Sequence, residues 1–291
     1  MKKQAFWRNI KVVPYLYILP NMILFMVFMI IPVFMALYYS FMDWKGIGDP
    51  VFTGLENYQW LFTDDTFWKS LWNTAYYTLA TVPFIMVLAL FLAMLLNMAL
   101  PLKGVFRAAI YLPAVVSTVV VGMMFTWLFQ DQVGLINYLL NLLGIESIQW
   151  ANDPKFAMIM LVAATIWQRT GYNMVIYLAG LQGISQEYYE AAIVDGASNW
   201  QRFRYLTLPL LKTTHVFVMI TCIIHSFRSF DLVYTMTKGG PLNSTKTMVM
   251  YIYELAFTRS QFGRASAAGV ALFTIMVVLT AVRFMNNKAE E

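Results

Sequence analysis

Long runs without charge are the feature that most constrains this sequence. Residues 12–42, 70–102, 108–130 and 265–282 contain no charged side chain. Each run reaches the length of roughly 18 residues that a helix needs to cross a bilayer. Only 12% of the chain is charged and 60% is hydrophobic, whereas a soluble domain carries about 25% charged residues. The pattern therefore excludes a soluble enzyme and a disordered chain, and it predicts a polytopic membrane protein built from helices.

Two further apolar segments are interrupted by charge. Segment 156–180 contains Arg169, and segment 213–236 contains Arg228 and Asp231. With these two segments we expect an all-α protein with six transmembrane helices in a single domain. The expected spans are about 14–41, 71–98, 106–129, 156–181, 212–236 and 264–285.

The positions of basic residues predict the orientation, because cytoplasmic loops carry an excess of Lys and Arg. More of these residues lie on the side of the chain termini, so we expect both termini in the cytoplasm. The first of them are Lys2, Lys3, Arg8 and Lys11. The apolar run that follows is longer than the apolar part of a signal peptide, and we expect it to remain as the first span. The net charge of +5 is explained by these loops, and no nucleic-acid partner is expected.

Residue types for catalysis and metal binding are scarce. The only cysteine, Cys222, excludes an intramolecular disulfide and a cysteine-based metal cluster. The two histidines, His215 and His225, are too few for a histidine-rich metal site. The sequence has neither a G-x-x-x-x-G-K-[ST] phosphate loop nor an H-E-x-x-H motif. We therefore expect no catalytic site, metal or cofactor in this chain.

A folded loop is predicted at 185–209, between the fourth and fifth spans on the cytoplasmic side. Ser185 has the position of an N-cap, and Gly196 has that of a C-terminal stop. Ser198 begins the capping-box pattern S-x-x-Q of a second short helix, which we expect Pro209 to end. The alternative is an amphipathic hairpin that lies on the membrane.

The same loop carries a specific resemblance. The string EAAIVDGA at 190–197, with a Leu–Pro pair at 208–209, resembles the EAA loop of ABC-importer permeases. Segments 106–129, 178–192 and 230–241 are similar to the carbohydrate-uptake branch, most of all to the first permease subunit of maltose- and glycerol-3-phosphate-type importers. The resemblance implies a coupling helix that docks on an ATPase. The residues implied in this contact are Glu190, Ala191, Ala192, Asp195, Gly196, Ala197 and Pro209.

The resemblance also implies a set of partners. They are a second homologous permease, two cytoplasmic ATPase subunits that bind ATP and Mg, an extracytoplasmic solute-binding protein and a carbohydrate. This chain is then a non-catalytic, multi-pass subunit in the lipid bilayer of the inner (plasma) membrane of a prokaryotic cell. A glycerol phosphate or another sugar-phosphate-like solute remains an alternative substrate. A self-sufficient secondary transporter, driven by a proton or sodium gradient, remains an alternative function.

Polar residues inside the fourth and fifth spans are candidates for the substrate path. An arginine at a helix centre costs about 2.5–3.5 kcal/mol, so Arg169 and Arg228 should face the bundle interior or an aqueous cavity. Arg228 and Asp231 are spaced to pair on a helix. These side chains either contact a sugar or only hold helices together. The aromatic residues over 67–77 are expected to form an interface belt. The substrate-path candidates are Trp167, Gln168, Arg169, Asn173, Thr221, His225, Arg228 and Asp231.

Overall fold

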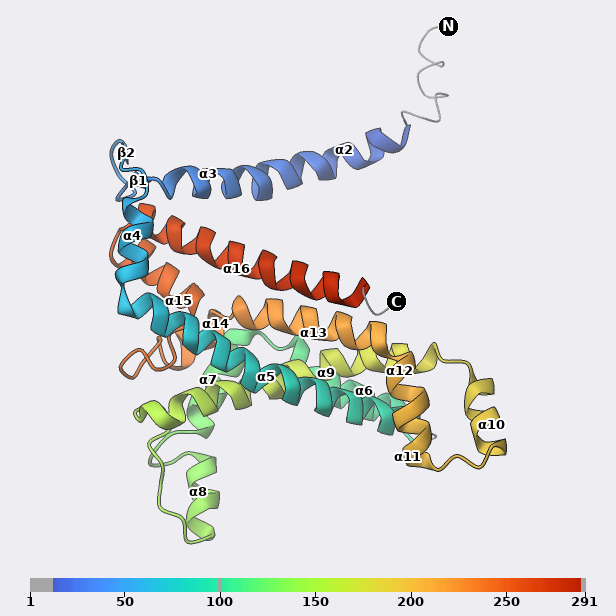
Figure 1. Cartoon of the computed structure of the whole chain (residues 1–291). Helices are drawn as coiled ribbons and strands as arrows, with labels where there is room; N and C mark the ends of the chain where they lie inside the picture. Colours follow the sequence, from blue (N-terminus) through green and yellow to red (C-terminus); the bar gives the residue numbers. More distant parts are fainter. Residues whose placement is uncertain (1–12, 99–100, 289–291) are drawn as a thin grey trace, which may run out of the picture. The chain divides into compact units, whose positions relative to one another are not determined.

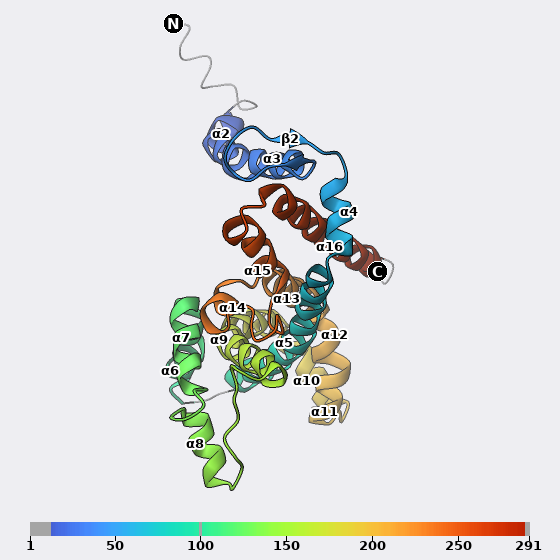
Figure 2. The same cartoon turned by 90° about the vertical axis from the view of Figure 1, so that its left-hand side faces the viewer.

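The computed structural model describes residues 13–98 and 101–288, with side chains for 14–98 and 101–281. The described residues are mostly helical (Figures 1 and 2) and divide into two compact units. The first unit joins the residues up to Asp64 with Ile252–Leu279, and the second contains Asp65–Tyr251. The single domain expected over 1–291 stays a prediction. The basic residues Lys2, Lys3, Arg8 and Lys11 lie outside the described residues.

The first unit contains a long apolar helix and a small hairpin. Its elements are α2 (Val13–Phe25), η1 (Met26–Ile30), α3 (Ile31–Tyr39), β1 (Met42–Asp43), β2 (Val51–Phe52), α4 (Glu56–Thr63), η3 (Glu254–Thr258) and most of α16 (Phe262–Lys288). The strands pair antiparallel, with Met42 opposite Phe52. The buried Asn57 holds this hairpin, because its Nδ2 donates to the carbonyl oxygens of Ser40 (2.9 Å) and Met42 (2.8 Å).

The second unit is a helical bundle around α5, α9 and α13, which lie side by side in both views (Figures 1 and 2). Its core includes the buried residues Ile85, Ala89, Met174, Leu178 and Val218. At one end α10 and α11 project, and α8 and α14 lie toward the opposite end (Figure 1). The elements are α5 (Asp65–Asn97), α6 (Lys103–Val115), α7 (Thr118–Leu128), α8 (Leu135–Leu142), α9 (Pro154–Gln182), α10 (Gln186–Val194), α11 (Asn199–Gln201), η2 (Arg202–Thr207), α12 (Leu208–Leu210), α13 (Lys212–Phe227) and α14 (Asp231–Met236), followed by α15 (Met248–Tyr253).

The expected helix over 106–129 is interrupted. Its two parts, α6 and α7, meet at an angle of 95°, and Val116 and Ser117 between them have extended backbone. The Gln168 side chain of α9 donates from Nε2 to the Val116 carbonyl oxygen, 3.1 Å away. This long-range bond satisfies a backbone group that the helix leaves unpaired, so the break is stable inside the bundle.

The expected helix over 212–236 is also interrupted. It ends at Phe227 and resumes as α14 at Asp231. Arg228 and Asp231 therefore lie on either side of a break, and no ion pair joins them in the described structure. The prediction that they pair on one helix is wrong, because the helical spacing between them does not exist.

The second helix of the loop ends one residue after Pro209, close to its expected end. The chain is helical from Asn199 through Leu210, and a bend of 66° at Leu211 separates this segment from α13. Pro209 lies directly after the π-helical turn η2, one residue before this segment ends at Leu210.

Three helices are long and apolar enough to cross a membrane: Pro14–Tyr39, Asp65–Asn97 and Phe262–Ala281. The two bent pairs raise the number to five among the described residues. Helix α9 has 29 residues, but its centre is too polar for it to belong to this set. The count of six spans stays a prediction.

Candidate functional site

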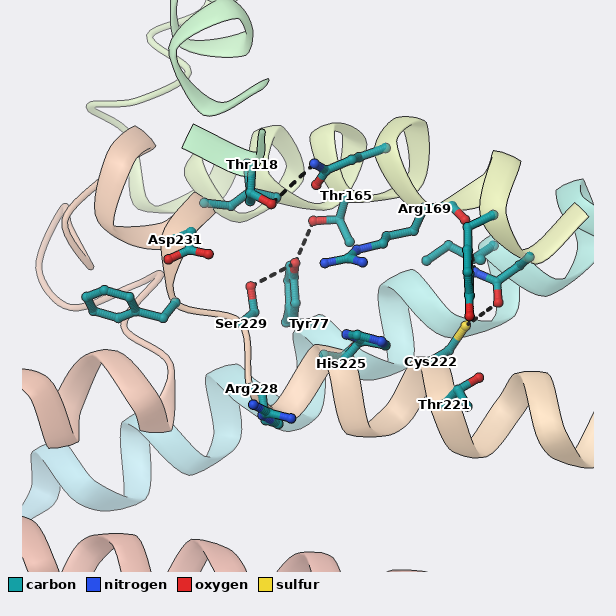
Figure 3. Close-up of a pocket in the computed structure, with 17 residues that line it drawn as sticks. Tyr77, Thr118, Thr165, Arg169, Thr221, Cys222, His225, Arg228, Ser229 and Asp231 are labelled. Atoms are coloured by element: carbon teal, nitrogen blue, oxygen red, sulfur yellow. Dashed lines mark hydrogen bonds between the residues drawn. The ribbon is translucent and has the colours of Figure 1, made fainter. Parts of the chain in front are cut away.

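A polar cavity of about 230 Å³ lies in the second unit, where both helix breaks meet α9 (Figure 3). Thr118 follows the first break, and Ser229 and Phe230 form the second. Breaks of this kind are tolerated at membrane depth where the irregular backbone is buried in protein or lines a cavity. The lining residues are Tyr77, Ile85, Thr118, Thr165, Gln168, Arg169, Tyr172, Asn173, Thr221, Cys222, His225, Ser226, Arg228, Ser229, Phe230, Asp231 and Leu232.

Seven of the eight substrate-path candidates line this cavity: Gln168, Arg169, Asn173, Thr221, His225, Arg228 and Asp231. The exception is Trp167, whose side chain is 41% exposed and packs against Phe125 with ring centroids 5.6 Å apart. The structure thus brings α9 and α13 candidates together and places Trp167 elsewhere. Their contact with a substrate stays a prediction.

Tyr77 connects three parts of the bundle at the cavity wall. Its ring is buried, and its hydroxyl lies 2.5 Å from Thr165 Oγ1 on α9 and 3.2 Å from Ser229 Oγ at the second break (Figure 3). The interface belt expected over 67–77 is therefore wrong for Tyr77, and Phe67 is buried as well. The sequence signal for this buried face is a polar stripe along α5 that includes Lys69, Asn73 and Tyr77. These residues are spaced by four, and residues four apart share one face of a helix.

That stripe also fixes the loop after α14. Lys69 Nζ donates to the Leu242 carbonyl oxygen at 2.7 Å, and Asn73 Nδ2 donates to the Asn243 carbonyl oxygen at 2.8 Å. A third bond runs from the Met248 backbone to Thr74 Oγ1 at 2.9 Å. The polar face of α5 thus replaces the hydrogen bonds that this irregular loop does not form itself.

Gln168 has two roles in the cavity wall. Its Nε2 donates to the Val116 carbonyl oxygen and to Thr118 Oγ1 (3.3 Å), so it bridges the first helix break. Its Oε1 is buried and accepts no hydrogen bond in the described structure. A free carbonyl oxygen of this kind can accept from a ligand hydroxyl.

Charge in the cavity comes from four side chains. Arg169 is half-buried, while Arg228, His225 and Asp231 are exposed. Asn173 Nδ2 donates to the Arg169 backbone oxygen (2.9 Å). This bond involves the main chain of Arg169 and not its guanidinium group. Among the described residues no three His, Cys, Asp or Glu side chains gather in a way that could hold a metal ion.

The loop at 185–209 begins and ends its first helix as expected. Ser185 Oγ accepts from the Glu187 backbone (3.4 Å). At the other end Ala197 donates to the Ala192 carbonyl oxygen (2.9 Å) and Gly196 donates to that of Ile193 (3.0 Å). This is a Schellman motif, which needs the positive φ of 77° that Gly196 adopts.

The second helix of the loop begins with the capping box formed by Ser198 and Gln201. Tyr189 of α10 and Thr207 of η2 connect the two helices through their hydroxyl groups, 3.1 Å apart. The loop is therefore held at both helix ends and across its middle. Glu190, Ala191, Asp195 and Gly196 are exposed, Ala192 and Ala197 are half-buried, and Pro209 is exposed.

Known proteins have sequences similar to this one. The lactose transport system permease protein LacF of Rhizobium radiobacter is 38% identical over 93% of this chain and 92% of its own. The sulfoquinovosyl glycerol transport system permease protein SmoG of Agrobacterium fabrum is 37% identical over 90% of this chain and 86% of its own.

A crystal structure shows the same fold. It is that of a bacterial ABC transporter involved in the import of the acidic polysaccharide alginate, with a TM-score of 0.85, 23% identity, and coverage of 98% of this chain and 99% of the other. Residues 85–288 match the family described as binding-protein-dependent transport system inner membrane component. The chain therefore belongs to the family of binding-protein-dependent transport system inner membrane components.

Proposed function

We propose that this chain is the permease subunit of an ABC importer and passes a carbohydrate that a solute-binding protein delivers from outside. The observation that carries the proposal is the polar cavity at the two helix breaks, in a chain of this family. Hydroxyl groups such as those of Tyr77 and Thr165 can pair with sugar hydroxyls, and the rings of Tyr172 and Phe230 can cover the apolar face of a pyranose. Relatives with about the same length are named for lactose and for sulfoquinovosyl glycerol.

A second, homologous permease completes the substrate path in this proposal. The cavity of about 230 Å³ is smaller than typical ligand pockets of roughly 300–1,000 Å³. Arg228, His225 and Asp231 line it and are exposed in the isolated chain. Both observations agree with a site whose remaining wall comes from another subunit.

The loop at 185–209 is the proposed contact with the ATPase subunits, which bind ATP and Mg. Glu190 and Asp195 are exposed on it, and the Val194 side chain is 87% exposed. A helix transmits force only if its ends are rigid, and the Schellman motif and capping box supply that rigidity. This contact requires the loop, and with it both chain termini, to face the cytoplasm.

Reconstitution tests the function directly. The chain is purified with its partner permease and ATPase subunits, placed in proteoliposomes, and supplied with its solute-binding protein and labelled sugar. ATP-driven accumulation is expected only with the complete set. Accumulation by this chain alone, driven by a proton or sodium gradient, would instead support the secondary transporter.

Two variants test the coupling loop. Glu190→Ala removes an exposed carboxylate whose charge-assisted bond to the ATPase should contribute about 1.5–3 kcal/mol, so retention of the ATPase during purification should fall tenfold or more. Gly196→Pro cannot adopt a φ of 77° and should abolish both retention and uptake. Glu146→Ala is the matched control, because Glu146 is an exposed carboxylate in the loop after α8. Equal retention in all three proteins would contradict the assignment.

A further inference from the structure

One end of the cavity is lined by basic side chains, which the binding of a neutral sugar does not require. Arg169, Arg228 and His225 all line it. The Arg169 side chain lies toward His225, and Arg228 follows His225 by three residues at the end of α13 (Figure 3). The one carboxylate of the lining, Asp231, lies apart from Arg169, beyond the Tyr77–Ser229 pair (Figure 3).

The guanidinium groups at this end have no partner of their own. Neither Arg169 nor Arg228 forms an ion pair or a side-chain hydrogen bond within the described parts of the chain. Arg169 is half-buried on α9 and points between Thr165 and His225 (Figure 3). A half-buried guanidinium without a counter-ion is stabilised when a bound anion supplies the opposite charge.

A neutral, hydroxyl-rich region adjoins this positive end. It contains the hydroxyls of Tyr77 and Thr165 and the unpartnered Gln168 Oε1, which is buried and can only accept a hydrogen bond. The arrangement therefore offers donors with positive charge at one side and hydroxyl-pairing groups at the other.

From this arrangement we infer that the cavity recognises an anionic carbohydrate, with the sugar ring beside Tyr77 and Gln168 and its acidic group on Arg169. The inference rests on the proposed transport function and specifies its substrate class. A carboxylate and a phosphate both fit a guanidinium in bidentate geometry, so the acidic group is defined here by its negative charge.

Saturation-transfer NMR on the assembled transporter in lipid nanodiscs tests the inference. The probes are methyl β-D-galactoside, methyl β-D-galacturonide and methyl β-D-galactoside 6-phosphate, which differ only at C6. Charge-assisted bonds are about twice as strong as neutral ones, and we expect each anionic probe to bind at least tenfold more tightly than the neutral probe. A preference for one of the two anions identifies carboxylate or phosphate as the natural group.

Substitutions test whether Arg169 causes the preference for the anionic probes. Arg169→Gln should reduce the tenfold preference to less than threefold, and Arg169→Lys, which keeps the charge but loses the bidentate geometry, should leave a preference between these two values. Lys155→Gln is the matched control, because Lys155 is an exposed cation on the same helix outside the cavity, and it should leave the preference unchanged. Gel filtration and retention of the ATPase identify any variant that fails to assemble.

Equal binding of the three probes, weak binding of both anions, or an unchanged preference in Arg169→Gln would each overturn the inference. A failed inference is distinguishable from a failed function. Transporter that accumulates a neutral sugar with ATP and shows no anion preference retains the function and loses the inference. Transporter that prefers the anionic probes and never accumulates sugar with ATP loses the function.

Discussion

The contact between α6 and α9 beside the cavity depends on Gly171. A Cβ added at this position would lie 2.9 Å from the carbonyl carbon of Ile110 and 3.0 Å from Tyr111 Cα, and closer still to the Ile110 carbonyl oxygen. Optimal contacts between carbon atoms are about 3.5–4.0 Å. Gly171→Ala must therefore push the two backbones apart by roughly 1 Å or more, because the contact with the Ile110 carbonyl oxygen is the shortest of the three.

Overpacking of this kind costs about 1–3 kcal/mol, so Gly171→Ala should lower the free energy of unfolding by about 2 kcal/mol. At about 2–4 °C per kcal/mol for a chain of this size, the Tm should fall by about 4–8 °C. Cys222 is the only cysteine and is 5% exposed, so a thiol-reactive fluorogenic dye reports unfolding directly.

Gly104→Ala is the matched control for this experiment. Gly104 lies on α6, and nothing is within 4 Å of an added Cβ there. Alanine is favoured over glycine in a helix by about 1 kcal/mol, so the control should unfold at the wild-type temperature or slightly above it. A Gly171→Ala protein with the same Tm as the control would refute the close-approach argument.

Three other substitutions test the hydrogen bonds and backbone geometry. Tyr77→Phe removes the hydroxyl bonds to Thr165 and Ser229 and should lower the free energy of unfolding by about 1 kcal/mol, measured with the same dye. An unchanged Tm would contradict a stabilising role for these bonds. Asn137→Ala deletes hydrogen bonds to Ile148 and Trp150 and should destabilise the segment after α7 by about 2–3 kcal/mol. Proteolysis of this segment should be faster, and cleavage at the wild-type rate would contradict the prediction. In Gly196→Ala the added Cβ has no atom within 4 Å, but the left-handed backbone conformation costs alanine about 1–2 kcal/mol. Hydrogen exchange of the α10 amides should therefore be at least fivefold faster, and unchanged exchange would exclude the strain.

Local chemistry was sufficient to predict the loop at 185–209. An N-cap, a Schellman glycine and a capping box depend on residues within four or five positions of one another, so Ser185, Gly196 and Ser198 specify their geometry in the sequence itself. The membrane class was equally accessible, because the length of an uncharged apolar run is set by bilayer thickness. The resemblance to the importer family came from this loop together with segments 106–129, 178–192 and 230–241, and it is confirmed by the family match.

Only tertiary structure decided where the spans break and which side chains meet. At the break, Gln168 donates a hydrogen bond to the Val116 carbonyl oxygen. The two residues are far apart in the sequence, so the helix propensity of the residues near Val116 cannot predict this bond. Helix α9 approaches α6 closely at Gly171, and in this packing Arg169 lines the cavity while Trp167 lies outside it. Local sequence fixes helix ends because their hydrogen bonds are local, whereas the cavity is made of long-range contacts that exist only after the helices have packed.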